Sequence, residues 1–380
     1  MKKKIAFVVA IPGSAQAFLK DHFILLTKEY DVNLVANFPD ENSKTVFEDM
    51  GVKCHYAPII RPISIKNDLK ALFALRKLFK KEQFVSIHSV TPKAGLLTAV
   101  AGWLAGVPYR VHIFTGQVWA TKKGVMRMLL KMLDCTTARF DTNILVDGES
   151  QRQFLIKEGV VKEKNSKVLA NGSICGVKLE RFIVSSEVRK AEREKFGFGG
   201  NDVVYIFLGR LNHDKGIDEL YEAFNKLVTE CPNAKLVLYG TDEEGYEEKA
   251  KEYVNLKSGI NFFYPGRTVK PFDALQGGDV FVLPTWREGF GNSVIEAQAL
   301  GLPVITSDAY GVVDTSVPDK TGLRCRVNDP EGLYGCMKIY YGNPEMRKSH
   351  GAAGRKRVEE LFNNKVVTAA WMEYYRELLK

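Results

Sequence analysis

The chain of 380 residues contains no uninterrupted apolar run that approaches the roughly 18–20 residues needed for a membrane-spanning helix. Its six cysteines are scattered, without a Cys-x-x-Cys pair or metal-finger spacing. This pattern argues against a disulfide-stapled secreted domain and fits a reducing cytoplasm. Apolar residues make up 45% of the chain and charged residues 26%, so a disordered or fibrous protein is excluded as well.

Three nucleotide-binding signatures are also missing. The sequence has neither the Gly-x-Gly-x-x-Gly of dinucleotide binders nor the Gly-x4-Gly-Lys-Ser/Thr of phosphate-loop NTPases, which argues against NAD and P-loop chemistry. It has no Asp-x-Asp pair either, although hard divalent cations favour clustered carboxylate oxygens. If the chain binds a diphosphate, we expect cationic side chains and helix N-termini to neutralise it, with no metal ion or other cofactor.

The N-terminus imitates a secretory signal peptide, because three lysines precede an apolar run over 5–11 and Ala15-Gln16-Ala17 resembles a cleavage site. The run is as short as the shortest apolar regions of signal peptides, and Pro12-Gly13 ends it. We therefore favour a buried first strand over Ile5–Ala10.

Strand-like apolar runs alternate with helix-period segments along most of the chain. Because the runs are almost continuously apolar, they predict parallel sheets covered by helices on both faces. The expected strands are Ile5–Ala10, Val32–Ala36, Phe84–His88, Tyr109–Phe114, Asn143–Val146, Val203–Leu208, Lys235–Leu238, Ile260–Phe263, Val280–Leu283 and Pro303–Thr306. The expected helices include Leu69–Lys81, Gly95–Ala105, Val125–Arg139, Ile217–Thr229 and Val294–Leu300.

The alternation stops once, over the charged and apolar-poor segment 176–201. A chain of this length is roughly two to three times a usual domain, so the interruption predicts two domains, residues 1–185 and 186–360. An amphipathic helix over 361–380, which carries Trp371 and Tyr375, is expected to cross back to the first domain.

The strongest motif, PTWREGFGNSVIEAQALGLPV over 284–304, follows a buried strand and opens a helix. Its glycines would let the backbone approach a ligand closely, and Asn292 or Ser293 could cap the helix that carries Glu296, whose free N–H groups would form an anion site. Two glutamates eight positions apart could both face a bound polyol, although a surface glutamate beside an ordinary turn would look the same. The residues concerned are Glu288, Gly289, Gly291, Asn292, Ser293 and Glu296.

The second motif, GRLNHDKG over 209–216, lies between the strand Val203–Leu208 and the helix from Ile217. Arg210 and Lys215 are two fixed cations beside glycines, which suits a diphosphate held without metal. A solvated turn with incidental charges is the alternative. Both motifs fall at strand ends of one sheet, where doubly wound folds bind ligands, and this coincidence favours a binding site.

Arg210 with Lys215, and Glu288-x7-Glu296 within EGFGNSVIEAQALGLPVI, resemble the donor site of the family 4 retaining glycosyltransferases of the GT-B fold. The resemblance covers nearly the whole chain, and TPKAGLL and TGQVWATKKG are similar to enzymes that assemble bacterial O-antigen, capsule or lipid-linked oligosaccharides. It implies an α/β protein of two Rossmann-like doubly wound domains that face each other across a cleft. Other matching segments are Ser89–Gly95, Asn171-Gly172, Leu179–Phe182 and Gly311–Asp314.

The resemblance also implies a role for each matching position. Arg210 and Lys215 would hold the donor diphosphate and offset the charge on the leaving group. Glu288, with backbone N–H groups from Phe290 to Asn292, would orient the donor sugar, and Glu296 would bind the ribose. Further implied donor-site residues are Gly13, in the loop after the first strand, where the backbone would approach the diphosphate, and Gly266 and Arg267 near the base.

One position departs from the family pattern. Many relatives place a histidine directly before the glycine that matches Gly116, and this chain has Thr115 there. His112 and His88 lie nearby in sequence, although a single histidine within a strand is more often a core residue. We list Thr115, His112 and His88 as candidates for the acceptor side of the site.

Positive charge is concentrated in the first half of the chain. Residues 1–180 carry 27 lysines and arginines against 16 acidic residues, whereas residues 181–380 carry 27 against 29. Cations interleave with bulky apolar residues at helical spacing, which is typical of a helix that lies on a membrane surface. The alternative is that the apolar residues face the sheet and the lysines are solvated. The stretches are Lys66–Lys70, Arg76–Lys81 and Lys122–Lys131.

Taken with the resemblance, these patterns predict a cytoplasmic enzyme that is peripheral on the inner face of the cytoplasmic membrane. It would move a hexose or N-acetylhexosamine, with retention, from a nucleotide sugar such as a UDP-sugar to a lipid-linked glycan on polyprenyl diphosphate. Two alternatives stay open, a UDP-sugar 2-epimerase of similar form and a basic nucleic-acid-binding protein. Nucleic acid is not an expected partner, because no RNP-like strand, helix-turn-helix or basic-aromatic pattern accompanies the charge.

Overall fold

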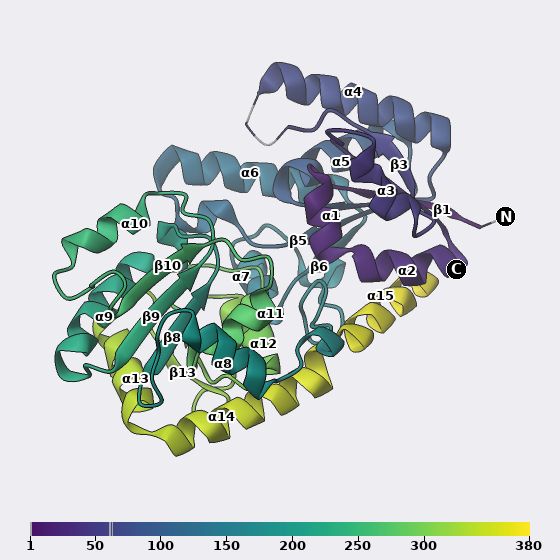
Figure 1. Ribbon diagram of the computed structural model, residues 1–380. Helices are drawn as coiled ribbons and strands as arrows, with labels where there is room; N and C mark the ends of the chain where they lie inside the picture. The colour runs from purple at the N-terminus through teal and green to yellow at the C-terminus, as the bar shows by residue number, and fades with distance from the viewer. Residues whose placement is uncertain (1, 61, 63) are drawn as a thin grey trace. The chain divides into compact units, whose positions relative to one another are not determined.

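The computed structural model describes residues 2–60, 62 and 64–380 and divides into two compact units (Figure 1). Unit 1 comprises the chain up to Cys175 together with Asn364–Lys380, and unit 2 comprises Gly176–Asn363. The chain therefore passes into unit 2 after Cys175, where we expected the change after residue 185.

Unit 1 is built on a sheet of seven parallel strands in the order β3-β2-β1-β4-β5-β6-β7. The strand order reverses at β1, and doubly wound folds bind ligands at the carboxyl edge of such a point. The sequence did not predict β3, a half-exposed edge strand, or β7, which has two residues. The strands are β1 (Lys4–Val8), β2 (Asp31–Ala36), β3 (Lys53–Tyr56), β4 (Ser86–Val90), β5 (Tyr109–Phe114), β6 (Asn143–Val146) and β7 (Ser166–Lys167).

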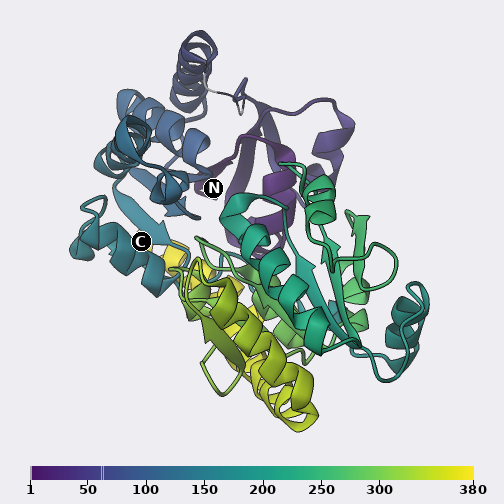
Figure 2. The ribbon, with the colours of Figure 1, turned by 90° about the vertical axis from the view of Figure 1, so that its left-hand side faces the viewer.

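Helices cover both faces of this sheet. Buried apolar side chains join one face to α2, α3 and α15, and the other face to α4, α5 and α6. α4 lies at the outside of unit 1 in both views (Figures 1 and 2). The helices are α1 (Pro12–Phe18), α2 (Lys20–Glu29), α3 (Asn42–Glu48), α4 (Ile65–Glu82), α5 (Pro92–Ala105), α6 (Gly124–Phe140), α7 (Glu149–Lys157) and α15 (Asn364–Leu378).

The C-terminal helix α15 packs against α2 as part of the core of unit 1 (Figure 1). Trp371 lies between two histidine rings, with ring centroids 4.3 Å from His22 and 5.0 Å from His88. A hydrogen bond of 2.7 Å joins the Tyr375 hydroxyl to Nδ1 of His88. The segment expected as a helix over 361–380 is thus anchored to the first sheet by aromatic packing.

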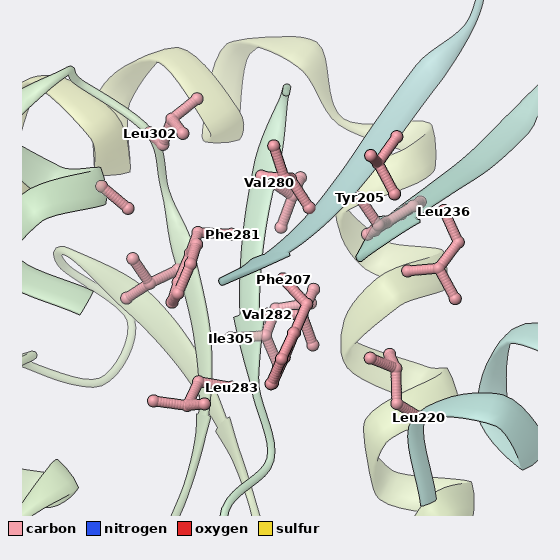
Figure 3. Close-up of a cluster of buried hydrophobic side chains, with 14 of the residues drawn as sticks. Tyr205, Phe207, Leu220, Leu236, Val280, Phe281, Val282, Leu283, Leu302 and Ile305 are labelled. Atoms are coloured by element: carbon pink, nitrogen blue, oxygen red, sulfur yellow. The ribbon is translucent and has the colours of Figure 1, made fainter. Parts of the chain in front are cut away.

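Unit 2 is built on six parallel strands in the order β10-β9-β8-β11-β12-β13, with the reversal at β8. Phe207, Val282 and Ile305 come from three neighbouring strands and pack in one buried cluster (Figure 3). Burial of each such side chain contributes about 1.5–3 kcal/mol. The strands are β8 (Val203–Leu208), β9 (Ala234–Tyr239), β10 (Phe262–Gly266), β11 (Val280–Leu283), β12 (Val304–Ser307) and β13 (Gly322–Cys325), the last of which was not expected.

The charged segment that we interpreted as a boundary forms α8 (Ser186–Glu194), which belongs to unit 2. Arg189 and Arg193 of α8 hold the Asp279 carboxylate at 2.5 and 3.0 Å, so charge and not apolar burial fixes this helix. The other helices are α9 (Ile217–Glu230), α10 (Tyr246–Lys249), α11 (Pro271–Ala274), α12 (Asn292–Ala299), α13 (Pro330–Gly342) and α14 (Pro344–Arg357).

Candidate functional site

Two loops lie side by side at the carboxyl edge of the unit 2 sheet, because β8 and β11 are neighbours. The first connects β8 to α9 and the second connects β11 to α12. The main-chain carbonyl of Asp214 accepts hydrogen bonds from Thr285 Oγ1 at 2.8 Å and from the Trp286 N–H at 2.9 Å. Gly216 has φ +71°, and a Cβ there would lie 2.1 Å from the Pro284 carbonyl oxygen. Close approach therefore requires glycine at this point.

Two ion pairs of opposite polarity join these loops. Lys215 donates to the Glu288 carboxylate, and both side chains are largely buried, at 17% and 13% exposed. One step earlier in each loop, the Arg287 guanidinium donates to Asp214 Oδ2 at 3.0 and 2.6 Å. The structure thus brings together Lys215 and Glu288, which the sequence predicted from separate motifs.

Arg210 lies at the same edge but is paired differently. Its guanidinium donates to Glu243, which follows β9, at 3.0 and 3.1 Å, and the Asn212 amide donates to the same carboxylate at 2.7 Å. Arg210 is mostly exposed, so this pair is open to exchange with a ligand anion. Both cations predicted for a diphosphate are therefore held by carboxylates.

Our prediction that Asn292 or Ser293 caps α12 is wrong. Both lie in the first helical turn, and the N-cap is Gly291, which has φ +100° and offers no side chain to the helix. The backbone of Glu288 is also approached closely, because a Cβ on Gly311 (φ +82°) would lie 2.4 Å from the Glu288 carbonyl oxygen. The glycines therefore bring the segments after β11 and β12 together.

Phe290 and Glu296, also in the 284–304 motif, differ in which of their groups could contact a ligand at the carboxyl edge of the sheet. The Phe290 ring belongs to the core and contacts Phe362 with ring centroids 5.2 Å apart, so only its backbone is available, and Gly289 is buried beside it. Glu296 on α12 is half-buried and has no hydrogen-bond or ion-pair partner within the described part of the chain. Burial raises the pKa of its carboxyl group to about 7.

Sequence reasoning missed three further residues of this edge. Asp214 and Arg287 form the second ion pair, and Glu243 holds Arg210. The adjacent dipeptides Asp214-Lys215 and Arg287-Glu288 carry complementary charges, which was a usable signal. Glu243 left no such signal, because it lies in an acidic turn that looks like a solvated surface.

The predicted base-side residues follow the edge strand. Gly266 ends β10 and accepts a hydrogen bond from the Gly240 N–H at 3.1 Å, and Arg267 is exposed. β10 is separated from β8 by β9, so these residues lie farther along the carboxyl edge than Arg210. No group of three or more His, Cys, Asp or Glu side chains that could hold a metal ion occurs among the described residues.

Of the four site residues predicted in unit 1, two are buried in its core. Gly13 is exposed and lies in the first turn of α1, where we expected a loop, and Thr115 is half-buried directly after β5. His112 is buried, shares a 2.8 Å hydrogen bond with Ser89, and burial lowers its pKa to about 3. His88 is fully buried against Trp371, and burial lowers its pKa well below the ordinary range. Both histidines are therefore core residues, and burial keeps their imidazoles from an acceptor.

Two family models match the chain, and one lies in each unit. Residues 25–172 match the glycosyl transferase 4-like domain, and residues 188–357 match the glycosyl transferases group 1. The structure of the Anabaena HepE protein in complex with UDP and glucose superposes with a TM-score of 0.80 at 17% identity, covering 99% of this chain and 100% of that one. Two parallel-sheet domains of this kind are the GT-B fold, which confirms the predicted fold class.

Relatives of known name are similar over most of their length. The capsular polysaccharide biosynthesis glycosyltransferase CapM of Staphylococcus aureus is 30% identical over 378 residues, which span 100% of this chain and 98% of that protein. An Escherichia coli enzyme named UDP-Gal:alpha-D-GlcNAc-diphosphoundecaprenol alpha-1,3-galactosyltransferase is 29% identical over 82% of this chain and 80% of its own length. The chain belongs to the group 1 family of glycosyltransferases.

Proposed function

We propose that the protein transfers a hexose or N-acetylhexosamine from a UDP-sugar to a glycan carried on polyprenyl diphosphate, with retention of anomeric configuration. The observation that carries this proposal is the grouping of Arg210, Lys215, Glu288 and Glu296 around the carboxyl edge of β8 and β11. Cations suit a diphosphate, and carboxylates suit the hydroxyl groups of two sugars. Family membership favours a transferase over the epimerase and over a nucleic-acid binder.

Donor binding would open two ion pairs, Lys215–Glu288 and Arg210–Glu243. The diphosphate would take Lys215 from Glu288 and Arg210 from Glu243, which leaves Glu288 able to accept hydrogen bonds from the donor sugar. Glu296 would accept from the ribose. The two cations, fixed before the reaction, would then stabilise charge as it grows on the departing UDP without metal, an effect worth several kcal/mol in preorganised sites.

Retention would follow attack on the face that UDP leaves. The acceptor hydroxyl oxygen would bond to the anomeric carbon as the bond from that carbon to the diphosphate oxygen breaks. The hydroxyl proton would pass to the departing diphosphate, so no protein nucleophile is required. This part of the proposal rests on the family resemblance, and the α-1,3 linkage in the name of the Escherichia coli relative is consistent with it.

The acceptor would be presented at a membrane surface by unit 1. Bulky side chains are exposed on α4 and α6, including Phe73 at 60% and Met128 at 67%, and lysines such as Lys66 and Lys122 are exposed beside them. No helix within the described residues is long and apolar enough to cross a bilayer. The Escherichia coli relative is named for an acceptor on diphosphoundecaprenol, which is a membrane lipid carrier. We infer that the protein is peripheral on the inner face of the cytoplasmic membrane.

Not every cation of the predicted basic surface is available for this purpose. Arg127 and Lys131 of α6 both donate to Glu158, at 2.8 and 2.7 Å, and both lie over the Trp119 ring. Lys122 and Lys123 precede the helix and are exposed. The lipid-facing charge would therefore come from the start of α6 and from α4.

The melting temperature in a panel of nucleotides and nucleotide sugars, with and without EDTA, tests the donor half of the proposal. A ligand that binds only the folded state raises the melting temperature by mass action. We expect UDP and one UDP-sugar to stabilise the protein to the same extent with EDTA present. No stabilisation by any nucleotide would contradict the donor site, and loss of stabilisation in EDTA would contradict metal-independent binding.

A second measurement separates the transferase from the epimerase. A UDP-sugar incubated without acceptor should keep its sugar configuration, whereas an epimerase would convert it. With a polyprenyl-diphosphate-linked acceptor, NMR of the product should show the anomeric configuration of the donor. An inverted product would remove retention from the proposal.

A further inference from the structure

Unit 1 contains an apolar pocket that the donor site does not use. It encloses about 390 Å³ on the face of the sheet covered by α4, α5 and α6. Most of its wall is aliphatic or aromatic, and two carboxylates and one lysine complete it. The apolar lining residues are Pro92, Leu96, Leu97, Val118, Trp119, Leu130 and Leu133.

The pocket lies beside the carboxyl edge of the unit 1 sheet. One wall is the beginning of α5, which follows β4 after a single residue, and another is Val118-Trp119, which comes shortly after β5. Thr115 stands between β5 and that wall. An occupant of the pocket would therefore lie next to the sheet edge at which doubly wound folds bind their ligands.

The polar groups of the pocket are already arranged. Lys93 on α5 pairs with Asp68 of α4 at 2.7 Å, and both side chains are partly exposed, at 18% and 23%. The Trp119 indole N–H donates to Asp134 at 2.7 Å, and burial raises the pKa of that carboxyl group to about 6. Lys93 is thus the single cation of the lining, held where an anionic headgroup could replace Asp68.

The exposed side chains around the pocket indicate which kind of molecule reaches it. Ile65, Leu69 and Phe73 on α4 are 79%, 49% and 60% exposed, and Val125 and Leu129 on α6 are 75% and 42% exposed. Both helices also line the pocket. Side chains four positions apart lie on one face of a helix, so each of these helices presents an exposed apolar stripe, and the exposed lysines of α4 beside it favour an anionic lipid phase.

We propose that this pocket binds the isoprene units nearest the diphosphate of the lipid-linked acceptor, with Lys93 at its rim contacting the diphosphate. The inference rests on the proposed function, because that function supplies an acceptor with an isoprenoid tail. A water molecule takes up roughly 30 Å³ in the liquid, and a carbon atom of an isoprenoid chain with its hydrogens is of similar size. The pocket of about 390 Å³ therefore holds about a dozen carbon atoms, which is two to three isoprene units. The rest of the chain would stay in the bilayer.

Calorimetric titration of the full-length protein with farnesyl diphosphate tests the proposal directly, because that probe has three isoprene units and a diphosphate, without the glycan of the acceptor. We expect dimethylallyl diphosphate, with one unit, to bind at least tenfold more weakly. Equal affinity for the two probes would show that only the headgroup is bound and would overturn the pocket assignment. Lys93→Ala should weaken the binding of farnesyl diphosphate severalfold and leave the binding of farnesol unchanged. An equal loss of affinity for both probes would show that Lys93 does not contact the headgroup.

A matched pair of valine variants locates the binding. Val118→Glu places a charge in the pocket wall at a position that is 42% exposed, whereas Val46→Glu places it on α3, on the other face of the sheet, at a position that is 37% exposed. We expect the first to reduce farnesyl diphosphate affinity at least tenfold and the second to leave it unchanged. Leu96→Trp, which fills the pocket, should behave like Val118→Glu. Equal effects of the two valine variants would overturn the proposal.

Two further readouts separate this proposal from its alternatives. UDP stabilisation is measured on the same samples, so a protein that binds UDP and not farnesyl diphosphate overturns the pocket and leaves the donor site intact. A protein that binds neither contradicts the proposed function as well. If Val118→Glu changes the sedimentation coefficient and not isoprenoid binding, the pocket seats a second copy of the chain, and the proposal is overturned.

Discussion

Lys215 and Glu288 are paired across two loops, and the residues directly before them, Asp214 and Arg287, are paired with the charges exchanged. The second pair lies beside the main-chain hydrogen bonds that Asp214 accepts. It therefore positions the backbone from which Lys215 and Glu288 project. The first pair can open for a ligand while the second keeps the loops together.

Removal of the positioning pair should impair the donor site in a non-additive way. We expect Arg287→Gln to lower kcat/KM for the donor about tenfold, and Asp214→Asn to do the same. The double variant should be no worse than either, since contacting residues share one interaction. Initial-rate measurements on the four proteins complete the cycle, and independent, additive losses would show that the two side chains do not act as a pair.

Lys215→Ala should reduce turnover at least about a hundredfold, because a preorganised charge that stabilises the leaving group is lost. The protein should remain folded because the buried sheets hold it, but its melting temperature should fall, since the variant leaves the largely buried Glu288 carboxylate without its partner. Lys226→Ala is the matched control, because Lys226 forms an exposed ion pair with Glu331 at 2.6 Å elsewhere in unit 2. Wild-type turnover in Lys215→Ala would remove the diphosphate assignment.

Glu243→Gln should tighten UDP binding, because the diphosphate no longer competes with a carboxylate for Arg210. Exposed ion pairs contribute about 0–1 kcal/mol, so the gain should reach at most about fivefold. Isothermal calorimetry measures it. Glu230→Gln, which removes a carboxylate that pairs with Lys338 at 2.5 Å, should have no effect. Weaker UDP binding in Glu243→Gln would indicate that Glu243 contacts the nucleotide itself.

UDP affinity should depend on the ionisation of Glu296. Burial raises the pKa of this carboxyl group to about 7, so it is mostly ionised at pH 8 and mostly protonated at pH 6. Because the ionised form is the stronger hydrogen-bond acceptor for ribose hydroxyls, affinity should fall by up to about tenfold as the pH drops from 8 to 6. UDP has its own titrating phosphate, so the quantity to measure is the ratio of the UDP affinity of the wild type to that of Glu296→Gln at each pH. A ratio that stays constant with pH would contradict the ribose contact.

The sequence predicted most of the framework of this fold because buried parallel strands leave a direct signal. β8 and β11 have the expected bounds, since each is an apolar run bounded by turn residues. β3 was missed because it is a half-exposed edge strand, and β13 because Gly322–Cys325 places an arginine within a short run. The sequence could not predict where unit 2 begins, because α8 is fixed by ion pairs to distant Asp279.

The candidate site was predictable only where charge stood beside glycine at a strand end. Lys215 and Glu288 met that condition, and the structure joins them. His88 carried a chemically attractive side chain, but strand periodicity does not show that Trp371 of a C-terminal helix covers it. Arg127 likewise belonged to a basic run, and only the fold reveals that Glu158 engages it. Long-range contacts decide such cases, and spacing in sequence does not contain them.

The membrane surface of unit 1 gives the last prediction. Lys122→Ala with Lys123→Ala should weaken binding to anionic phosphatidylglycerol liposomes by about thirtyfold, because each surface lysine contributes about 1 kcal/mol. Met128→Ser should weaken it further by removing an apolar contact, whereas Arg127→Ala should add little, since Arg127 pairs with Glu158. Lys20→Ala with Lys28→Ala removes equal charge from α2, on the other face of the sheet, and is the control in a liposome cosedimentation assay. UDP stabilisation should be unchanged in every variant. Equal loss of binding in the α2 control would mean that net charge, and not the surface of α4 and α6, attracts the lipid.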